Sequence, residues 1–380
     1  MSERSRQCHH RHFPPGARQD RRTLGREAAH PGPRRQSQQH VLKGHHAMNI
    51  IDVTSPDRLT RPTRRLTGAI VATGLGIAAA TGPSVAIAQE RSPPADSIRY
   101  KAVSVDGINI FYREAGDPAK PTILLLHGFP ASSHEFRTLI PLLSARFHLV
   151  APDYPGFGFS DAPGEIRFAP TFANLATVMG HFVRAVGLTR FTIYMQDFGG
   201  PVGFRLAVAH PDMIDGLIIQ NANAYETGIA PDVLKDMRTR AAGPLDAKAS
   251  AALEGMLSPD GTKFQYLTGA RDPANVDPTS YRLDSFVQAL PQQHRVQRAL
   301  IVDYYDNVRQ YPAWHAYLKA RQPKTLILWG KNDPIFLPAG AQAYRDDVPK
   351  AEVHMLDTGH FALEEDAGAV AAHILRTFGE

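Results

Sequence analysis

Residues 195–200 read MQDFGG, and this short stretch decides the fold of the chain. It lies between a short β-prone run, Phe191 to Met195, and a helix-like stretch, Val202 to Ala209. A strand, a tight turn and a helix in this order lift one side chain to the top of a sheet, beside backbone amides that can stabilise an oxyanion. Asp197 is the lifted residue, so the sequence predicts attack through a carboxylate and not through a hydroxyl.

Charge is distributed unevenly along the chain. The whole sequence of 380 residues carries a formal net charge of +5, but residues 1–88 hold 14 Lys and Arg against 5 Asp and Glu. From Gln89 onward 28 basic and 32 acidic residues remain, which leaves this part acidic. A basic excess favours nucleic acid or an anionic membrane as a partner. Because the excess belongs to the leader, we expect no nucleic-acid binding.

The first 88 residues have the pattern of a leader and a signal peptide. Residues 1–47 lack apolar periodicity and are rich in Arg and His, which is typical of disorder, and we interpret Met48 as the true start. Basic residues, an apolar stretch from Leu66 through Ala80 and small residues up to Ala88 then follow. Glycines interrupt the apolar stretch, which disfavours a membrane anchor. We expect cleavage near Ala88, export to the periplasm or the medium, and no stable membrane insertion of the mature chain.

The remaining chain is long enough for one large domain with an insertion. Apolar strand-like runs alternate with amphipathic helical stretches, which predicts an α/β fold with a mostly parallel sheet flanked by helices. Asp106 and Gly107 form a favourable hairpin turn between the first two strands. The expected strands are Tyr100–Val105, Ile108–Glu114, Thr122–Leu126, Phe147–Ala151, Phe191–Met195, Gly216–Gln220, Thr325–Trp329 and Val353–Leu356, with a helix over Phe136–Leu143. Catalytic loops of such sheets lie at the carboxyl ends of the strands.

The stretch HGFP, His127 to Pro130, follows directly after the expected strand that ends at Leu126. We expect the backbone N–H of Phe129 in this loop to form an oxyanion hole with the N–H of Phe198, which follows the nucleophile. A simple strand-to-helix turn is the alternative interpretation, and the nucleophile turn disfavours it.

Two further polar residues follow late strands of the predicted sheet. Asp333, in GKNDPIF, comes just after the strand that ends at Trp329, and His360, in LDTGHFALEE, comes just after the strand that ends at Leu356. Nucleophile, acid and histidine then occur in the chain order expected for this architecture. The glycines of residues 151–161 match neither the dinucleotide nor the Walker spacing, so we interpret that stretch as a structural turn.

Together these motifs resemble the α/β-hydrolase superfamily, from about Tyr100 to Glu380. Within it the chain is similar to the branch of epoxide hydrolases and haloalkane dehalogenases, in which the nucleophile is Asp; no GxSxG occurs, which disfavours a serine esterase. HGFP resembles the epoxide hydrolases, whereas Gln196 resembles the dehalogenases, whose turn reads VQDWGG. The resemblance implies a helical cap inserted after the strand that follows the nucleophile helix.

The two enzyme classes of this branch need different donors. The dehalogenases stabilise a departing halide with an indole N–H, usually from a Trp at the position of Phe198, where this chain has no side-chain donor. Only Trp314 and Trp329 remain, and Trp329 belongs to an expected core strand. An epoxide hydrolase instead protonates the opening oxygen with tyrosines of the cap. These needs favour the epoxide hydrolases.

The resemblance also implies the domain organisation and the proton donors. DYYDNVRQYPAW, residues 303–314, resembles the stretch that carries one cap tyrosine; Tyr305 aligns best, and Tyr304 is its nearest rival. Tyr266, in KFQYLTGARDP, is the other candidate donor. The expected segments are a leader, a signal peptide, a first core part, a cap and a second core part, at residues 1–47, 48–88, 97–224, 225–310 and 311–380.

The predicted reaction is a two-step covalent hydrolysis. Asp197 attacks an epoxide carbon to form an alkyl-enzyme ester, while Tyr305 and Tyr266 protonate the oxygen. His360, oriented by Asp333, then takes a proton from the water that hydrolyses the ester. Carboxylate, imidazole and water supply this chemistry, so we expect no metal and no organic cofactor.

The expected substrate is small and hydrophobic, in an apolar pocket lined by Phe129, Phe198 and Trp314. Two alternatives stay open: dehalogenation or another hydrolysis through an ester on Asp197, and a ligand-binding protein that keeps the fold with little turnover. Halide release from haloalkanes favours the first, and ligand-induced stabilisation without product favours the second. The only cysteine, Cys8, lies in the leader, so the mature chain has no thiol for a disulfide or a zinc cage.

Overall fold

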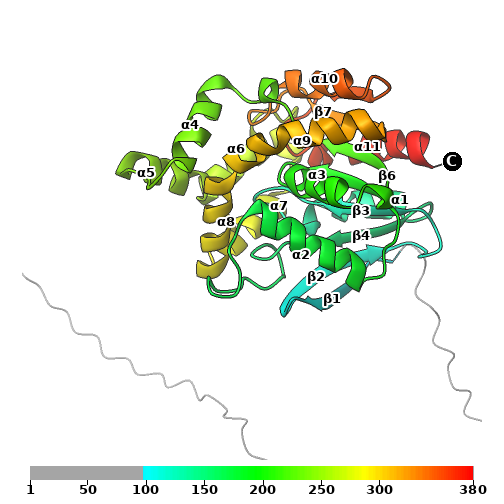
Figure 1. Ribbon diagram of the computed structural model, residues 1–380, viewed down its shortest axis with the longest axis horizontal. Helices are drawn as coiled ribbons and strands as arrows, with labels where there is room; N and C mark the ends of the chain where they lie inside the picture. Colours follow the sequence, from blue (N-terminus) through cyan, green and yellow to red (C-terminus); the bar gives the residue numbers. More distant parts are fainter. Residues whose placement is uncertain (1–96, 380) are drawn as a thin grey trace, which may run out of the picture. The chain divides into compact units, whose positions relative to one another are not determined.

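An eight-stranded sheet forms the centre of the structure (Figure 1). The computed structural model describes residues 97–379, so the predicted leader and signal peptide at residues 1–88 lie outside the described residues. The strands β1 to β8 are Arg99–Val105, Ile108–Ala115, Thr122–Leu126, His148–Pro152, Phe191–Gln196, Ile214–Gln220, Lys324–Gly330 and Glu352–Leu356. Their order across the sheet is β1-β2-β4-β3-β5-β6-β7-β8. All the expected strands are therefore confirmed, with ends that differ by one or two residues.

The sheet is antiparallel at one edge and parallel elsewhere. β2 pairs antiparallel with both β1 and β4, and every later pairing is parallel. The β1–β2 hairpin turns at Asp106 and Gly107, whose φ values are 52° and 74°. Positive φ at both central residues is the geometry that matches the twist of a tight hairpin. The predicted hairpin is thus confirmed together with its turn.

Side chains of the central strands alternate between two separate cores. Ile193 and Met195 of β5 point into one core, and Tyr194 between them points into the other. This period of two buries both faces of the sheet under helices. Helices α2, α3 and α10 contribute to the first core, whereas α1 and α11 contribute to the second. These core helices are α1 Leu139–Leu143, α2 Phe172–Ala185, α3 Gly199–Ala209, α10 Pro338–Asp347 and α11 Leu363–Phe378.

Two expected helices begin elsewhere than predicted. The helix after the nucleophile begins at Gly199 and not at Val202, because Pro201 fits the first turn, where no N–H donor is required. In place of one helix over Phe136–Leu143, a 3-10 helix η1 (Ser133–Arg137) precedes α1. Pro141 has no N–H to donate to the carbonyl of Arg137 four residues earlier, so the α-helical turn starts only at α1.

A helical insertion, which we call the cap, lies between β6 and β7. Helices α4, α5, α6 and α8 of the cap lie to the left of the sheet in Figure 1. The expected boundary at residue 310 falls inside α9, which continues onto the core, where Trp314 stacks on Phe204 of α3 at 5.0 Å between ring centroids. The cap helices are α4 Pro231–Ala241, α5 Ala247–Met256, α6 Pro259–Leu267, α7 Pro278–Gln288, α8 Pro291–Asp303 and α9 Tyr305–Arg321. Short 3-10 helices η2 (Pro211–Met213), η3 (Glu226–Gly228) and η4 (Pro273–Asn275) complete the described elements.

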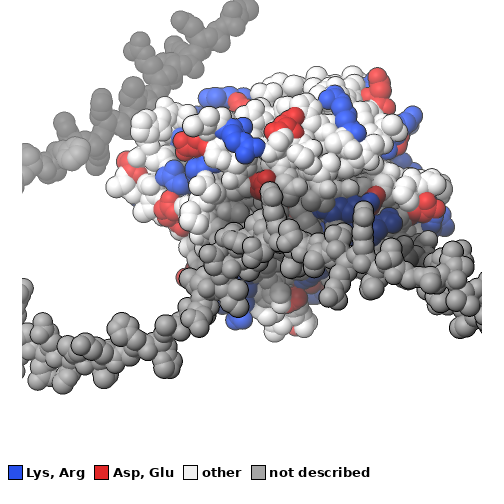
Figure 2. All heavy atoms as spheres, turned by 90° about the horizontal axis from the view of Figure 1, so that it is seen from below, with Lys and Arg blue, Asp and Glu red and all other residues white. Residues whose placement is uncertain are grey.

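The surface is mixed in charge where Figure 2 draws it in colour: basic and acidic side chains are interspersed there. Several large apolar side chains of the cap are exposed, namely Val233, Met256, Phe264, Phe286 and Leu290. Among residues 97–379 no helix has the length and apolar character needed to cross a membrane.

Candidate active site

Asp197 occupies the tight turn between β5 and α3. Its φ is 47°, in the left-handed region that residues other than glycine rarely adopt. Two glycines allow the chain to pass close by: a Cβ on Gly199 would lie 2.2 Å from the carbonyl oxygen of Leu126, and one on Gly128 would lie 2.6 Å from the Asp197 Cβ. The turn therefore presents the Asp197 carboxylate at the carboxyl end of β5.

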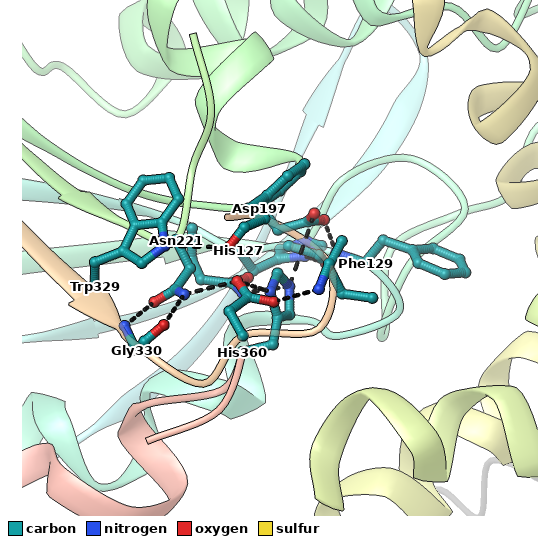
Figure 3. A network of polar contacts seen from close by, with 12 residues as sticks. His127, Phe129, Asp197, Asn221, Trp329, Gly330 and His360 are labelled. Carbon is teal, nitrogen blue, oxygen red and sulfur yellow. Dashed lines mark hydrogen bonds and ion pairs between the residues drawn. The ribbon is translucent and has the colours of Figure 1, made fainter. Parts of the chain in front are cut away.

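Two backbone amides face this carboxylate. The N–H of Phe129 donates a hydrogen bond of 2.8 Å to Asp197 Oδ1 (Figure 3). The N–H of Phe198 also bonds to the carboxylate. The structure thus brings the two predicted oxyanion donors to one carboxyl group. An oxygen that gains negative charge at this carboxyl carbon would already lie against both donors.

His127 holds the loop that carries Phe129. Its Nδ1 lies 2.8 Å from the carbonyl oxygen of Gly128, and its Nε2 lies 3.2 Å from the backbone nitrogen of Tyr154. Burial lowers the pKa of His127 to about 3, so the ring is neutral, with Nδ1–H donating and Nε2 accepting. His127 therefore has a structural role, and its ring is not available as a base.

His360 and Asp333 form a fully buried pair. His360 Nδ1 lies 2.9 Å from Asp333 Oδ2, and that oxygen also accepts a 2.7 Å hydrogen bond from Asn221 Nδ2. The side-chain oxygen of Asn221 accepts the N–H of Gly330, so this residue ties the end of β6 to the end of β7 (Figure 3). Asn221 was missed by the sequence analysis; its signal is an Asn placed directly after a buried strand, at a φ of 43°.

The other ring nitrogen of His360 faces the nucleophile. His360 Nε2 lies 3.8 Å from Asp197 Oδ2 and 3.0 Å from Gln196 Nε2. In the orientation in which the Gln196 amide N–H donates to Nε2, the Nδ1 proton is directed at Asp333, and Gln196 Oε1 is buried without a partner among residues 97–379. The reversed amide would instead accept a proton from Nε2.

The pKa values of the nucleophile and the histidine are coupled. Burial raises the pKa of Asp197 above its ordinary value, although His360 and the two amides oppose the shift. Burial acts against the charged form of His360, but the charge and hydrogen bond of Asp333 and the charge of Asp197 outweigh it, so the pKa of His360 is raised. Each group therefore depends on the charge state of the other.

A cavity of about 370 Å³ opens above Asp197, between the core and the cap. Its lining is Phe129, Asp197, Phe198, Met237, Arg240, Ala252, Gly255, Met256, Gly261, Phe264, Gln265, Ile301, Tyr304, Ile335 and Phe336. Phe129 and Phe198 lie there as expected, whereas Trp314 does not: it is buried against Phe204 in the core. Among residues 97–379 no three His, Cys, Asp or Glu side chains are grouped as metal ligands.

The tyrosines of the cap are placed differently from the expectation. Tyr305 does not line the cavity, and its hydroxyl accepts a hydrogen bond of 2.9 Å from Arg238 Nε at the surface. Tyr266 is stacked on Phe361, and its hydroxyl donates a 2.5 Å bond to Asp284. Neither predicted donor therefore reaches the cavity.

Tyr304, the rival of Tyr305, lines the cavity instead. Its ring centroid is 5.8 Å from that of Phe198, and its hydroxyl is buried without a hydrogen-bond partner among residues 97–379. Burial raises the pKa of Tyr304 well above its ordinary value, so the phenol keeps its proton. Tyr304 therefore brings to the cavity wall a protonated phenol whose buried hydroxyl has no partner among residues 97–379.

The two tryptophans of the chain are both occupied elsewhere. Trp329 Nε1 donates to the carbonyl oxygen of Phe336 at 3.3 Å, within the core. Trp314 packs under α9 and is not part of the cavity lining. Neither indole N–H is therefore presented to a leaving group beside Asp197.

Comparison with known proteins gives one family model and several relatives. The model described as alpha/beta hydrolase fold matches residues 121–367. An uncharacterized hydrolase of Saccharomyces cerevisiae is 41% identical over 287 residues, which cover 74% of this chain and 98% of the relative. Haloalkane dehalogenase 2 of Mycobacterium tuberculosis is 28% identical and covers 68% of this chain and 88% of its own. Epoxide hydrolase 3 of Xenopus tropicalis is 34% identical over 123 residues, 32% of this chain and 33% of that protein.

Proposed function

Because the chain belongs to the α/β-hydrolase fold family, in the Asp-nucleophile branch of dehalogenases and epoxide hydrolases, we propose that it opens epoxides to diols through an ester on Asp197. The observation that carries this proposal is the phenol of Tyr304, which lines the same cavity as the Asp197 carboxylate and has no hydrogen-bond partner among residues 97–379. A strained C–O bond needs a nucleophile on carbon and a proton on oxygen, and these two groups supply both.

In the first step the Asp197 carboxylate attacks one epoxide carbon. The C–O bond breaks, its electron pair moves to the oxygen, and the Tyr304 hydroxyl transfers its proton there. An alkoxide is a stronger base than a phenolate, so the transfer is favourable even though burial raises the pKa of Tyr304. The product of the step is a hydroxyalkyl ester of Asp197 and a tyrosinate, which regains its proton when water re-enters.

In the second step water attacks the carboxyl carbon of Asp197. His360 Nε2 removes the proton from this water, and Asp333 stabilises the imidazolium that forms through the 2.9 Å contact with Nδ1. The negative charge of the tetrahedral intermediate collects on the oxygen against the Phe129 and Phe198 amides. Collapse of the intermediate releases the diol and restores the carboxylate, and the proton on His360 returns through water to the Tyr304 phenolate, which resets both groups.

Formation of the ester also changes the pKa of His360, the base that hydrolyses it. The negative charge of Asp197 is one of the causes that raise the pKa of His360, and esterification removes this charge. The pKa of His360 therefore falls when the intermediate forms. More of the imidazole is then neutral at the moment when it must accept a proton from water.

Dehalogenation is the second candidate function, favoured by Gln196 before the nucleophile and by the dehalogenase among the relatives. A carboxylate nucleophile and a histidine base serve that reaction equally well. A halide, however, needs donors at the point of departure, and Phe198 and the two buried indoles offer none from the described part of the chain. This difference favours the epoxide.

Trapping the ester tests the proposal. The full chain with His360→Gln is incubated with styrene oxide and, separately, with bromobutane, and the intact mass is measured; Asp197→Asn in the same background is the control. Loss of the base stops hydrolysis, so we expect the mass of the epoxide to be added and to map to the peptide of Asp197. An adduct from the bromide alone would favour the dehalogenase. No adduct from either would contradict covalent hydrolysis of these substrates.

A further inference from the structure

The cap tyrosine Tyr266 has no part in the reaction proposed above. It is buried and does not line the cavity above Asp197. Its ring lies flat on the ring of Phe361, with 3.9 Å between the centroids and 4° between the planes. Phe361 directly follows His360 in the chain, and these two rings meet edge to face at 5.1 Å. A side chain of the cap therefore packs on the residue next to the proposed base.

The stacked rings belong to a small apolar cluster between the cap and the core. Val276 of the cap and Ala131 of the core complete the cluster with Tyr266 and Phe361, and all four side chains are buried. Ala131 directly follows the HGFP loop that carries the Phe129 amide. A stacked aromatic pair contributes about 0.5–1.5 kcal/mol beyond the area it buries. The loop of the base and the loop of the oxyanion donor therefore meet the cap at one point.

A second cap residue fixes the far end of the Tyr266 side chain. The hydroxyl of Tyr266 donates a 2.5 Å hydrogen bond to Oδ2 of Asp284 on α7, a carboxyl group that is itself buried. Burial raises the pKa of Asp284 to about 8, and the charges of Glu364 and Asp153 add to the shift. The bond from Tyr266 and the charge of Arg137 oppose it. Asp284 is therefore mainly protonated at neutral pH, so the buried pair carries little charge and needs no counterion.

The helix that carries Asp284 is tied to the core on its own account. Ser280 of α7 donates a 3.1 Å hydrogen bond to Glu364, near the start of α11. Arg137 of η1 binds the same carboxylate with two hydrogen bonds of 2.9 and 2.8 Å. Paired bonds of this kind fix a carboxylate in direction as well as in distance. Asp284 therefore holds Tyr266 from a helix that is fastened to α11, the helix that follows the loop of the base.

We propose that Tyr266 and Asp284 are positioning residues, through which the cap holds the loop of His360 in place for hydrolysis of the ester. The imidazole must meet Asp333 with one nitrogen and the attacking water with the other, and a displacement of about 1 Å can lower a rate about 100-fold. Because Tyr266 does not line the cavity, its effect falls on the second step and not on the attack by Asp197. The affected step rests on the proposed function, whereas the placement of His360 can be measured without turnover.

Quenched-flow measurement of a single turnover of styrene oxide by the full chain tests the positioning role. Tyr266→Leu removes both the stack and the hydroxyl, so it should slow hydrolysis of the ester about 10- to 100-fold and leave its formation within about threefold. Tyr266→Phe keeps the stack and loses the bond, so its hydrolysis rate should lie between the other two. Tyr281→Leu is the control, because Tyr281 packs against the same cluster with its ring 6.1 Å from that of Tyr266; it should not slow hydrolysis selectively.

The partner carboxyl group gives a conservative and a disruptive variant. Asp284→Asn keeps an acceptor for the Tyr266 hydroxyl at the same place, whereas Asp284→Leu removes it. Asp284→Asn should therefore retain most of the hydrolysis rate that Asp284→Leu loses, and Asp284→Leu should behave like Tyr266→Phe. Equal rates in the two Asp284 variants would contradict a role for the bond.

The pKa of His360, measured by NMR without substrate, separates a failure of the positioning role from a failure of the proposed function. The contact with Asp333 is one of the causes that raise this pKa, so a displaced imidazole should titrate at lower pH in Tyr266→Leu and not in Tyr281→Leu. If styrene oxide forms no ester in the wild-type chain and the pKa still falls in Tyr266→Leu alone, the positioning role stands and the reaction does not. If the pKa and both kinetic steps respond alike in Tyr266→Leu and Tyr281→Leu, the pair only packs the cap on the core and the positioning role is overturned.

Discussion

Replacing Tyr304 with Phe should make the protein more stable and its first chemical step slower. The hydroxyl of Tyr304 is buried and unpaired among residues 97–379, and an unsatisfied buried polar group costs about 1–3 kcal/mol. Phe fills the same space without this hydroxyl. Because a domain of this size changes its Tm by roughly 2–4 °C per kcal/mol, Tyr304→Phe should melt about 2 °C or more above the wild-type chain.

The same substitution removes the proposed proton donor. Loss of a general acid typically lowers a rate by about 100- to 10,000-fold, and here the loss falls on formation of the ester and not on its hydrolysis. Quenched-flow measurements of a single turnover of styrene oxide separate the two steps, and thermal unfolding of the same samples gives Tm.

Tyr305→Phe is the matched control. Its hydroxyl bonds to Arg238 at the surface, so its removal should change stability by less than about 0.5 kcal/mol and leave ester formation unchanged. The reasoning is refuted if Tyr305→Phe slows ester formation while Tyr304→Phe does not, or if Tyr304→Phe melts below the wild-type chain.

Two further changes test the turn and its charges. Asp197→Asn should lower the pKa of His360, because the carboxylate is one of the groups that raise it. The pKa is measured by NMR of the imidazole nitrogens as a function of pH. An unchanged or higher pKa would contradict the coupling. The same variant should be more stable at neutral pH, because the pKa of Asp197 is raised in the folded state and its charged form is disfavoured. The gain should shrink as pH falls through that pKa, and a gain that does not depend on pH would argue against this cause. Gly199→Ala should lose about 2–3 kcal/mol or more in denaturant unfolding, because its Cβ would meet the backbone oxygen of Leu126 at 2.2 Å, whereas Gly164→Ala, with open space around it, should be close to neutral.

The parts of the site that could be predicted from the sequence are those that depend on local backbone geometry. The strand, the glycines and the left-handed turn at Asp197 are local features, and HGFP is local in the same sense. Strand ends of a parallel sheet converge by topology, so Asp333 and His360 could be placed from their position after late strands alone. The 2.9 Å contact between them follows from that placement.

The orientation of the cap side chains could not be predicted in the same way, and the reason is physical. Tyr304 and Tyr305 are adjacent, and neighbouring positions on a helix point about 100° apart, so a shift of one residue exchanges the cavity for the surface. The orientation depends on how α8 and α9 pack on each other and on the core, which no local pattern records. Trp314 was misplaced for the same cause, since α9 carries it back onto α3.

The partners of the charged groups were also beyond the sequence. Asn221 and Asp333 are far apart in the chain and meet only because β6 and β7 are neighbours in the sheet. Arg240 looks like one of several basic residues on an amphipathic helix until its burial is known. Burial and long-range pairing, and not residue type, distinguish these side chains from their neighbours.

Because the cap is inserted between β6 and β7, the groups for the two steps of the proposed reaction come from two different parts of the chain. The groups proposed for hydrolysis of the ester, Asp197, Asp333 and His360, follow strands of the sheet, whereas Tyr304 and Arg240 belong to the insertion. Sequence change in the insertion away from Tyr266 and Asp284 can therefore alter which molecule is captured and how fast it is captured, while the release of product continues at its own pace. Mutations confined to the insertion could therefore give the protein new substrates. As they accumulate, the rate-limiting step would change between formation of the ester and its hydrolysis.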